Sequence, residues 1–214
     1  MNKITLQQTL PEVFADRNEV CSEVWHQTVE WKKEGIYLVE AQSGTGKSSL
    51  CSYIYGYRDD YQGIIGFDGE NIRHNTVKQW VGLRRNSLSM MFQDLRLFTE
   101  LTVWENIWLK NQLTGYQSKK QIEEWLGQLG IADKKKVLVS KISFGQQQRV
   151  ALLRALCQPF DFIFLDEPVS HLDKGNAKKM AEILVSEVKR QGAGVVVTSI
   201  GSRLDLPYTK IFRL

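Results

Sequence analysis

The sequence predicts a single α/β domain in which helices flank a parallel sheet. An apolar, β-rich run at Gly35–Glu40 precedes a helix-forming segment at Lys47–Tyr55. The continuous apolar run Phe162–Leu165 is typical of a parallel strand that is buried on both faces. A third such run, Gly194–Thr198, follows a helix predicted over Lys174–Lys189. This alternation of strands and helices is what produces a parallel sheet.

The chain divides into three zones. Residues 1–93 are expected to hold an antiparallel β portion, with a hairpin at Gly63–Gly69, and the first strand and helix of the parallel sheet. Residues 94–157 are mostly helical, with a helix-start signal at Thr102–Glu105. Residues 158–214 return to strand, helix and strand. We therefore expect a helical insertion in an otherwise α/β domain, with no linker and no repeat.

The segment AQSGTGKS, between the first parallel strand and its helix, is typical of a phosphate-binding loop. Gly44 and Gly46 allow the backbone to turn so that successive N–H groups point into one concavity at a helix N-terminus. Lys47 is expected to reach the β- and γ-phosphates, and the Ser48 hydroxyl to complete a Mg²⁺ shell. Alanine replaces the usual first glycine, a small change that leaves the prediction intact. The predicted contacts are Ala41, Gln42, Ser43, Gly44, Thr45, Gly46, Lys47, Ser48 and Ser49.

Two carboxylates follow the strand Phe162–Leu165. We expect Asp166 to hold Mg²⁺ and Glu167 to accept a proton from an attacking water as a general base. The alternative is a pair of acids that cap a surface turn before Pro168. The phosphate-binding loop in the same chain favours the catalytic interpretation.

The segment ISFGQ predicts a helix N-terminus with exposed backbone N–H groups. Ser143 and Gln146 have the spacing of a capping box, and the helix is expected to run to about Cys157. Gly145 leaves backbone N–H groups accessible there, although no phosphate group is implied nearby in the sequence.

These motifs, taken in order, resemble those of the ABC (ATP-binding cassette) family. ISFGQ stands where that family has LSGGQ, with Ile142 for leucine and Phe144 for the first glycine. The resemblance implies a P-loop NTPase fold with a RecA-like core and a helical subdomain, and ATP and Mg²⁺ as cofactors. It also implies that Ser143, Gly145 and Gln146 of one subunit cap the nucleotide of the other. The segment LTVWENI is similar to the short cassettes of the lipoprotein-release and macrolide-export type.

The resemblance assigns further residues. Gln93 matches the Q-loop, which reads Mg²⁺ and links it to the helical subdomain. SHLD at Ser170–Asp173 matches the D-loop, with His171 in place of a small residue. Phe14 is a candidate for stacking on adenine, with core packing as the equal alternative. The set implied for catalysis is thus Lys47, Gln93 and Glu167, and the set implied for the metal is Ser48, Gln93 and Asp166.

One expected group is missing. After the last parallel strand the family places a switch histidine that contacts the γ-phosphate, and this chain has Ser199. Only His26, His74 and His171 exist, and none follows that strand. Loss of a phosphate-contacting donor typically costs about 10²–10³ in rate. Either Glu167 supports slow hydrolysis, or the chain acts through ATP-induced closure with little turnover.

The function implied is the ATP-binding and ATP-hydrolysing subunit of an ABC transporter. Its expected partners are a second copy or a homologous cassette and integral membrane permease subunits, which would place it at the cytoplasmic face of a membrane. The alternative is an ATP-gated regulatory cassette with weak or no hydrolysis. DNA-repair cassettes carry a long coiled coil between the phosphate loop and the signature, and this chain has too few residues there. Cargo, transport direction and the identity of the second cassette stay open.

Composition agrees with a soluble globular protein that binds no nucleic acid. The net charge is +4, and no basic stripe or nucleic-acid motif is present. No run of about 18 apolar residues exists to span a membrane, and no leader is expected, because no charged start followed by an apolar stretch is present at the N-terminus. Three scattered cysteines are expected to be reduced thiols. Trp104 and Trp108 share a helix face, either as core or as part of a docking surface.

Overall fold

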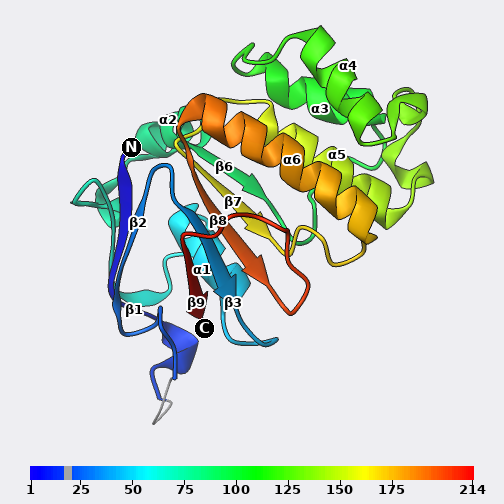
Figure 1. Cartoon of the computed structure of the whole chain (residues 1–214). Coiled ribbons are helices and arrows are strands. Elements are labelled where there is room, and N and C mark those ends of the chain that lie inside the picture. The colour runs from blue at the N-terminus through cyan, green and yellow to red at the C-terminus, as the bar shows by residue number, and fades with distance from the viewer. Residues whose placement is uncertain (17–20) are drawn as a thin grey trace.

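Two sheets form the body of the protein, shown in Figure 1 as a computed structural model that describes residues 1–16 and 21–214. The antiparallel sheet has the order β2–β1–β4–β5, with bounds Thr28–Lys32, Lys3–Pro11, Tyr61–Phe67 and Glu70–Asn71. The parallel sheet has the order β6–β7–β8–β3–β9, with bounds Leu88–Met91, Phe162–Asp166, Gly194–Ser199, Ile36–Glu40 and Lys210–Arg213. The predicted parallel sheet and antiparallel N-terminal portion are both confirmed.

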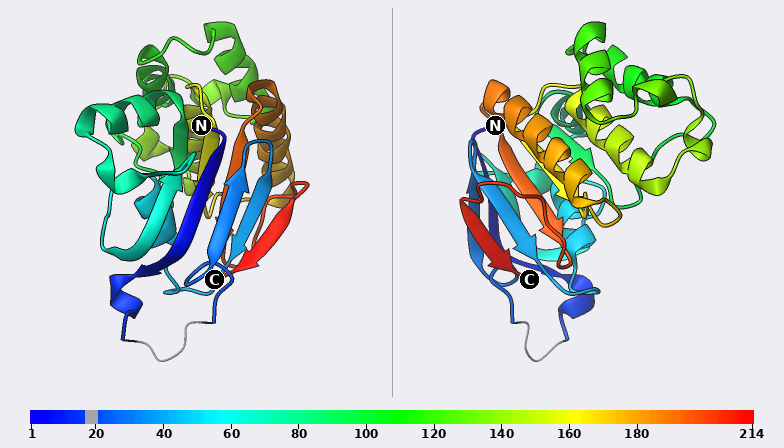
Figure 2. Two further views of the ribbon diagram at one scale, coloured as in Figure 1. Left: turned by 90° about the vertical axis from the view of Figure 1, so that its left-hand side faces the viewer. Right: turned by 45° about the vertical axis from the view of Figure 1, so that its right-hand side comes forward.

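Helices surround the parallel sheet and form a lobe at one end. The bounds are α1 Lys47–Ile54, α2 Val77–Asn86, α3 Val103–Gln112, α4 Lys119–Gln128, α5 Phe144–Leu156 and α6 Lys174–Gln191. Short 3-10 helices span η1 Glu12–Phe14, η2 Ile72–His74, η3 Ala132–Lys134 and η4 Val139–Lys141. In Figures 1 and 2, α3 and α4 lie at the end of the molecule away from the C-terminus. No helix in the described ranges is long and apolar enough to cross a membrane.

Local signals placed several of these elements correctly. The capping box expected at Thr102 opens α3, and the one expected at Ser143 opens α5. The hairpin predicted at Gly63–Gly69 is confirmed. Strand β4 ends at Phe67, and β5, which begins directly after Gly69, pairs with it antiparallel. The helix α2, which also starts with a capping box at Thr76, was not predicted.

Strands β6, β7, β8 and β3 of the parallel sheet are buried on both faces, as continuous apolar strands require, whereas the edge strand β9 is mostly exposed. In β7, Ile163 and Leu165 face a core that continues into α5, α6 and the helical lobe. Phe162 and Phe164 face the opposite core, built with α1 and the antiparallel sheet. Successive side chains of a strand alternate between faces, so this one segment joins the two cores. The carboxyl ends of the strands of the parallel sheet carry the residues of the site.

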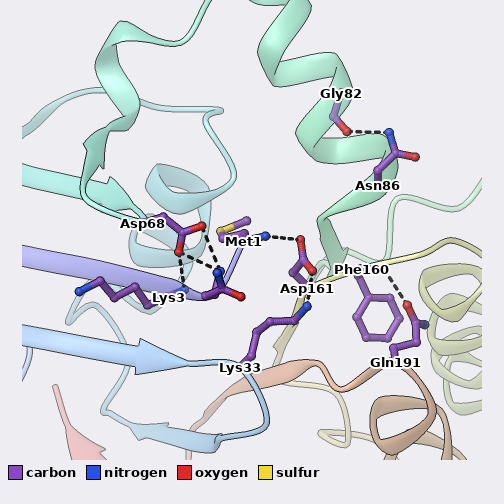
Figure 3. A network of polar contacts seen from close by, with 10 residues as sticks. Met1, Lys3, Lys33, Asp68, Gly82, Asn86, Phe160, Asp161 and Gln191 are labelled. Atoms are coloured by element: carbon purple, nitrogen blue, oxygen red, sulfur yellow. Dashed lines mark hydrogen bonds and ion pairs between the residues drawn. The ribbon is translucent and has the colours of Figure 1, made fainter.

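A network of polar contacts fixes the start of the chain to the start of β7 (Figure 3). Asp161 accepts a hydrogen bond from the Met1 ammonium at 2.9 Å and one from Lys33 Nζ at 2.6 Å. Nearby, Asp68 accepts hydrogen bonds from the backbone N–H groups of Asn2 and Lys3. Burial favours a higher pKa for Asp161, but the hydrogen bonds from Lys33 and the N-terminal ammonium outweigh it and lower the pKa. The ionised carboxylate therefore stabilises the folded state.

Asp161→Asn is expected to lower the free energy of unfolding by about 1–3 kcal/mol at neutral pH, because two charged donors lose their acceptor. A carboxyl with a lowered pKa in the folded state contributes fully above its unfolded pKa, near about 3.9. That contribution is lost as the pH falls through the lower folded value. Urea unfolding at pH 7 and at pH 3 should show the difference between wild type and variant shrinking in acid. The exposed Asp133, paired only with its neighbour Lys134, supplies the control Asp133→Asn. A difference that persists in acid would contradict this account.

Candidate functional site

The loop between β3 and α1 has the backbone that a phosphate site needs. Gly44 and Gly46 have φ values of 80° and 96°, in the left-handed region where a side chain is strained. A Cβ atom at Gly46 would also lie 3.1 Å from the Trp25 ring and 3.2 Å from the Phe14 ring. Glycine is therefore required at position 46 both by its conformation and by the aromatic residues beneath the loop.

Lys47, the first residue of α1, is held inside this loop. It is buried, and its Nζ donates a hydrogen bond to the Gln42 carbonyl oxygen at 3.0 Å. Thr45 Oγ1 donates to the same carbonyl at 2.9 Å. Glu167 Oε1 lies 3.7 Å from Lys47 Nζ, so the two catalytic candidates form an ion pair. The structure thus brings together the loop, its lysine and the predicted base.

Glu167 has an unusual backbone for its residue type. Its φ of 50° lies in the left-handed region, and its N–H donates to the Thr198 carbonyl of β8 at 3.2 Å. Such conformations in non-glycine residues persist where the surrounding structure enforces them, and they are frequent at functional sites. The turn at the end of β7 therefore directs the Glu167 side chain towards Lys47 instead of continuing the strand.

Three oxygen-bearing side chains converge next to Lys47. Ser48 Oγ donates to Gln93 Oε1 at 3.1 Å, and both line one cavity of about 460 Å³ with Asp166. Asp166 is buried and accepts a hydrogen bond from Thr198 Oγ1. Hydroxyl, amide and carboxylate oxygens are the donor set that Mg²⁺ prefers, usually completed by phosphate and water. The described residues contain no group of three His, Cys, Asp or Glu side chains that could hold a metal by themselves. The site therefore fits a Mg²⁺ that arrives with a phosphate.

The phosphate-binding loop borders a cavity of about 400 Å³, lined by Val13, Phe14, Ser43, Gly44, Gly46, Lys47, Ser48, Ser49, Gln93, Glu167 and Ile200. Ser43, Gly44 and Ser48 are exposed, so one side of the loop faces solvent. Of the described residues that line this cavity, none belongs to ISFGQ. The signature lies elsewhere on the chain, as expected if it serves a different copy.

Phe14 is mostly a core residue. Only 5% of it is exposed, and it packs with the aromatic residues under the loop. It still borders the cavity beside Val13, which is 70% exposed. The structure favours the packing alternative for Phe14, and stacking on adenine stays a prediction.

Trp25 is the loop-supporting residue that sequence reasoning missed. It is buried, and its Nε1–H donates to the Thr45 carbonyl oxygen at 3.0 Å. No motif marks it, since it lies far upstream of the loop and contacts it only in the folded chain. It fixes the backbone of the loop from below.

Trp25→Phe is expected to weaken ATP binding about fivefold, because removal of a hydrogen bond worth about 1 kcal/mol releases the loop backbone. Binding titrations with ATP would measure this. Trp31→Phe is a matched control: Trp31 is equally buried, but its Nε1 has no hydrogen-bond partner within residues 1–16 and 21–214, and it lies on β2. Equal losses in both variants would indicate general destabilisation instead of a loop effect.

The signature helix α5 begins with the predicted capping box. Ser143 Oγ accepts from the Gln146 N–H at 3.3 Å, and Gln146 Oε1 accepts from the Ser143 N–H at 2.9 Å. Phe144 is 41% exposed and packs edge-on against the His171 ring, with centroids 4.6 Å apart. A Cβ atom at Gly145 would lie 3.0 Å from the His171 carbonyl oxygen. The signature and the SHLD segment are therefore one continuous surface.

Ser199 does not take the position of a phosphate-contacting group. Its Oγ donates to the Ser202 carbonyl oxygen at 2.5 Å, and the residue is 1% exposed. Its own carbonyl accepts from the Ala41 N–H at 3.1 Å. Ile200, the next residue, is the one that borders the nucleotide cavity. Ser199 thus holds two loops together, and the switch segment offers an apolar side chain to the site.

A third cavity of about 420 Å³ lies between the parallel sheet and α3; we call it the groove. Its lining is Tyr55, Tyr57, Ser89, Met90, Phe92, Arg96, Phe98, Asn106, Leu109, Lys110, Leu113, Arg154 and Ala155. Large apolar groups are exposed along it, namely Tyr57, Phe98, Leu109 and Leu113. No carboxylate among the described lining residues balances its three cations. Burial and the nearby Arg154 guanidinium lower the pKa of Lys110 to about 8.

Stacked cations and rings build one wall of the groove. The Arg96 guanidinium lies 4.0 Å from the Phe92 ring centroid and 5.0 Å from that of Tyr57. The Arg84 guanidinium lies 4.8 Å from the Tyr57 ring centroid and 5.2 Å from that of Trp80. These contacts join α2, the segment after α1 and the Q-loop into a rigid wall.

Trp104 and Trp108 do not line the groove. Their rings stack at 5.5 Å between centroids, with an interplanar angle of 10°. Lys135 Nζ lies 4.1 Å from the Trp104 ring and Lys119 Nζ 5.2 Å from that of Trp108. Both tryptophans pack against the core of the helical lobe, in line with the core alternative.

Comparison with known proteins identifies the family. A family model described as ABC transporter matches residues 28–170. The lipoprotein-releasing system ATP-binding protein LolD of Aquifex aeolicus is 33% identical over 172 residues, 78% of this chain and 76% of that protein. An uncharacterized ABC transporter ATP-binding protein of Mycobacterium tuberculosis is 30% identical over 177 residues, 81% of this chain and 71% of that protein.

Solved structures show the same fold. The dimeric ATP-binding cassette MJ0796 bound to ADP and Pi superposes with a TM-score of 0.75 at 23% identity, covering 92% of this chain and 87% of that chain. At this identity the likeness concerns the fold. Together with the family match and the convergence of Lys47, Asp166 and Glu167, it shows that the chain belongs to the ABC transporter family, as an ATP-binding and ATP-hydrolysing subunit.

Proposed function

We propose that two copies of this cassette, or one copy and a homologous cassette, enclose ATP and Mg²⁺ between the phosphate loop of one and the N-terminus of α5 of the other. The observation that supports this is the separation of the two surfaces. The loop leaves Ser43, Gly44 and Ser48 exposed, while Ser143 and Gly145 lie outside the cavity that the loop borders. A site in one subunit is therefore open on the side that a second subunit would close.

The binding and catalytic residues predicted for this site have the following roles in hydrolysis. Backbone N–H groups of the loop between β3 and α1 bind the phosphates, and Lys47 Nζ neutralises charge on the β- and γ-phosphates. Ser48, Gln93 and Asp166 hold Mg²⁺, which when bound neutralises phosphate charge. Glu167 orients a water molecule and accepts its proton as the water oxygen attacks phosphorus. From the second subunit, Ser143, Gly145 and Gln146 close the site, and the products are ADP and phosphate.

Phosphate release from ATP and Mg²⁺ by the purified chain, measured over a range of protein concentrations, tests this proposal. A site shared by two subunits gives a specific activity that rises with concentration until dimers predominate. A site complete within one subunit gives a constant specific activity, which would contradict the shared site.

We further propose that the groove receives a helical segment of an integral membrane permease subunit, which holds the cassette at the cytoplasmic face of a membrane. The apolar side chains of Phe98, Leu109 and Leu113 suit the apolar face of such a segment. No carboxylate lies beside Lys110 and Arg154 among the described lining residues of the groove, so an acidic side chain on the segment would complement them. The LolD relative, named for a lipoprotein-releasing system, is consistent with a membrane partner.

Leu113→Arg is expected to lower the membrane-bound fraction of the cassette about tenfold in cells that express it, because it removes apolar burial and adds a fourth cation. Fractionation of those cells measures the effect. Val77→Arg changes a similarly exposed apolar residue on α2, outside the groove, and serves as the control. Both variants should keep their ATPase activity. Equal release of both from the membrane would contradict docking in the groove.

The second candidate function is an ATP-gated regulator that closes on a membrane partner with little hydrolysis. The inward orientation of Ser199 favours it, because the Ser199 hydroxyl donates to the Ser202 carbonyl and Ser199 is not among the described residues that line the nucleotide cavity. Ser199→His should raise the rate of phosphate release if the rest of the site is competent. ATP-dependent dimers without release, in both wild type and this variant, would favour the regulator.

A further inference from the structure

His171 belongs structurally to the signature surface. Its ring packs on Phe144 at 4.6 Å, and its backbone carbonyl approaches Gly145 closely enough that a Cβ there would lie 3.0 Å away. Ser170 Oγ lies 2.9 Å from His171 Nδ1 and accepts a hydrogen bond from Gln148 Nε2 of α5 at 3.1 Å. The imidazole is therefore held by two contacts, the Phe144 ring and the Ser170 hydroxyl that is itself bonded to α5, and any surface that meets the N-terminal turn of α5 also meets His171.

The outer edge of this imidazole is available. His171 is exposed, and its described contacts are the T-shaped contact with the Phe144 ring and the Ser170 hydroxyl at Nδ1. Nε2 has no hydrogen-bond partner among the described residues. Because Ser170 engages Nδ1, the ring is oriented with Nε2 directed away from its own subunit's D-loop.

The nucleotide cavity lacks the group that His171 could supply. Ser199 is turned to Ser202, and the neighbouring Ile200 places an apolar side chain at the cavity. Lys47 is then the one cation among the described lining residues. The exposed side of the cavity is the side that a partner's α5 covers in the dimer proposed above, and His171 is attached to that helix.

We propose that His171 of the partner subunit contacts the γ-phosphate in trans and replaces the missing switch histidine. This inference rests on the proposed dimer. In the reaction, the water oxygen attacks the γ-phosphorus, Glu167 accepts the water proton, and the bond to the β-phosphate oxygen breaks to leave ADP. Nε2–H of the imidazole donates to a γ-phosphate oxygen and stabilises the charge that develops there. Each complete site thus takes its base from one subunit and its histidine from the other.

The first test is the rate of phosphate release by His171→Ala. The expected result is a fall in kcat of about 10²-fold, with a smaller change in KM, because the contact strengthens in the transition state. His171→Asn, which keeps a hydrogen-bond donor, should recover part of the loss. His74→Ala, an exposed histidine on η2, is the matched control and should equal wild type. ATP-dependent dimer formation by His171→Ala, measured by light scattering, shows that the variant still folds and closes.

The second test mixes two inactive variants, His171→Ala and Glu167→Gln, before ATP is added. In a mixed dimer, one site keeps Glu167 from the first chain and His171 from the second, while the other site loses both. Random pairing at equal concentrations makes half of the dimers mixed, so activity should return to about one quarter of wild type. If His171 instead acts on its own subunit's nucleotide, no mixed dimer contains an intact site and activity stays at the sum of the two variants.

The outcomes separate this inference from the proposed function. Wild type that hydrolyses ATP as a dimer, with His171→Ala equally active, overturns only the role of His171. Loss of activity in His171→Ala without recovery in the mixture overturns the action in trans. Wild type with a constant specific activity at every concentration contradicts the shared site itself, and with it this inference.

Discussion

Phosphate release by Glu167→Gln is expected to fall by about 10²–10⁴-fold, the usual contribution of a positioned general base. The amide is nearly the same size as the carboxylate but cannot accept the water proton. The carboxylate lies 3.7 Å from Lys47 Nζ and sits on a backbone held in the left-handed region, so few other groups can replace it. Single-turnover measurements with ATP and Mg²⁺ would report the chemical step directly.

ATP binding by Glu167→Gln should persist, and its ATP-bound dimer should outlast that of wild type because hydrolysis no longer reopens it. Glu182→Gln, an exposed position on α6, controls for the loss of one negative charge. Undiminished turnover in Glu167→Gln would show that Glu167 is not the general base. A phosphate oxygen or another carboxylate would then have to accept the water proton.

Lys47→Ala is expected to weaken ATP binding strongly. Removing one member of a buried, hydrogen-bonded charge pair costs about 2–5 kcal/mol, so the affinity for ATP should fall by about 30-fold to 4,000-fold. The side chain is only 5% exposed and also holds the Gln42 carbonyl, so its loss loosens the loop as well as removing the cation. Calorimetric titration with ATP measures the change.

Lys178→Ala is the matched control, because Lys178 is an exposed lysine on α6, outside the nucleotide cavity. It should bind ATP like wild type. A Lys47→Ala variant that binds ATP normally would show that the backbone N–H groups of the loop suffice and that the lysine acts later in the reaction.

The parts of this site that the sequence predicts are those built from neighbours in the chain. The phosphate loop is one unbroken segment, and the Ser143 capping box needs only residues three apart. The buried strand of β7 and the carboxylates after it follow from one apolar run. In each case, local backbone geometry is enough to position the chemistry.

Contacts between distant segments were not predictable in this way. Trp25 supports Thr45 through a bond that exists only after β2 and β3 are in place. Asp161 holds the first residue of the chain, which no pattern links to β7. The sequence shows that Ser199 replaces a histidine, but its inward bond to Ser202 depends on how the following loop folds.

The pairing of Phe144 with His171 combines both kinds of information. Each residue departs from the family pattern in a separate motif, and the sequence presents them as two unrelated substitutions. In the fold the rings touch. Because Phe144 and His171 contact each other, the two substitutions are more simply explained as one altered surface than as two unrelated losses of motif residues.

The Q-loop borders both the nucleotide cavity and the groove, and this position has a thermodynamic consequence. Gln93 borders the nucleotide cavity, whereas Phe92 and Arg96 border the groove and are clamped there by the stacked rings and guanidinium groups. A segment seated in the groove and a nucleotide in the loop therefore act on the same few residues of backbone. By linkage, any factor by which ATP changes the affinity of the cassette for its membrane partner is the factor by which that partner changes its affinity for ATP. A change of Arg96 or Tyr57, far from any phosphate, should thus be measurable as a change in how strongly the permease alters nucleotide binding.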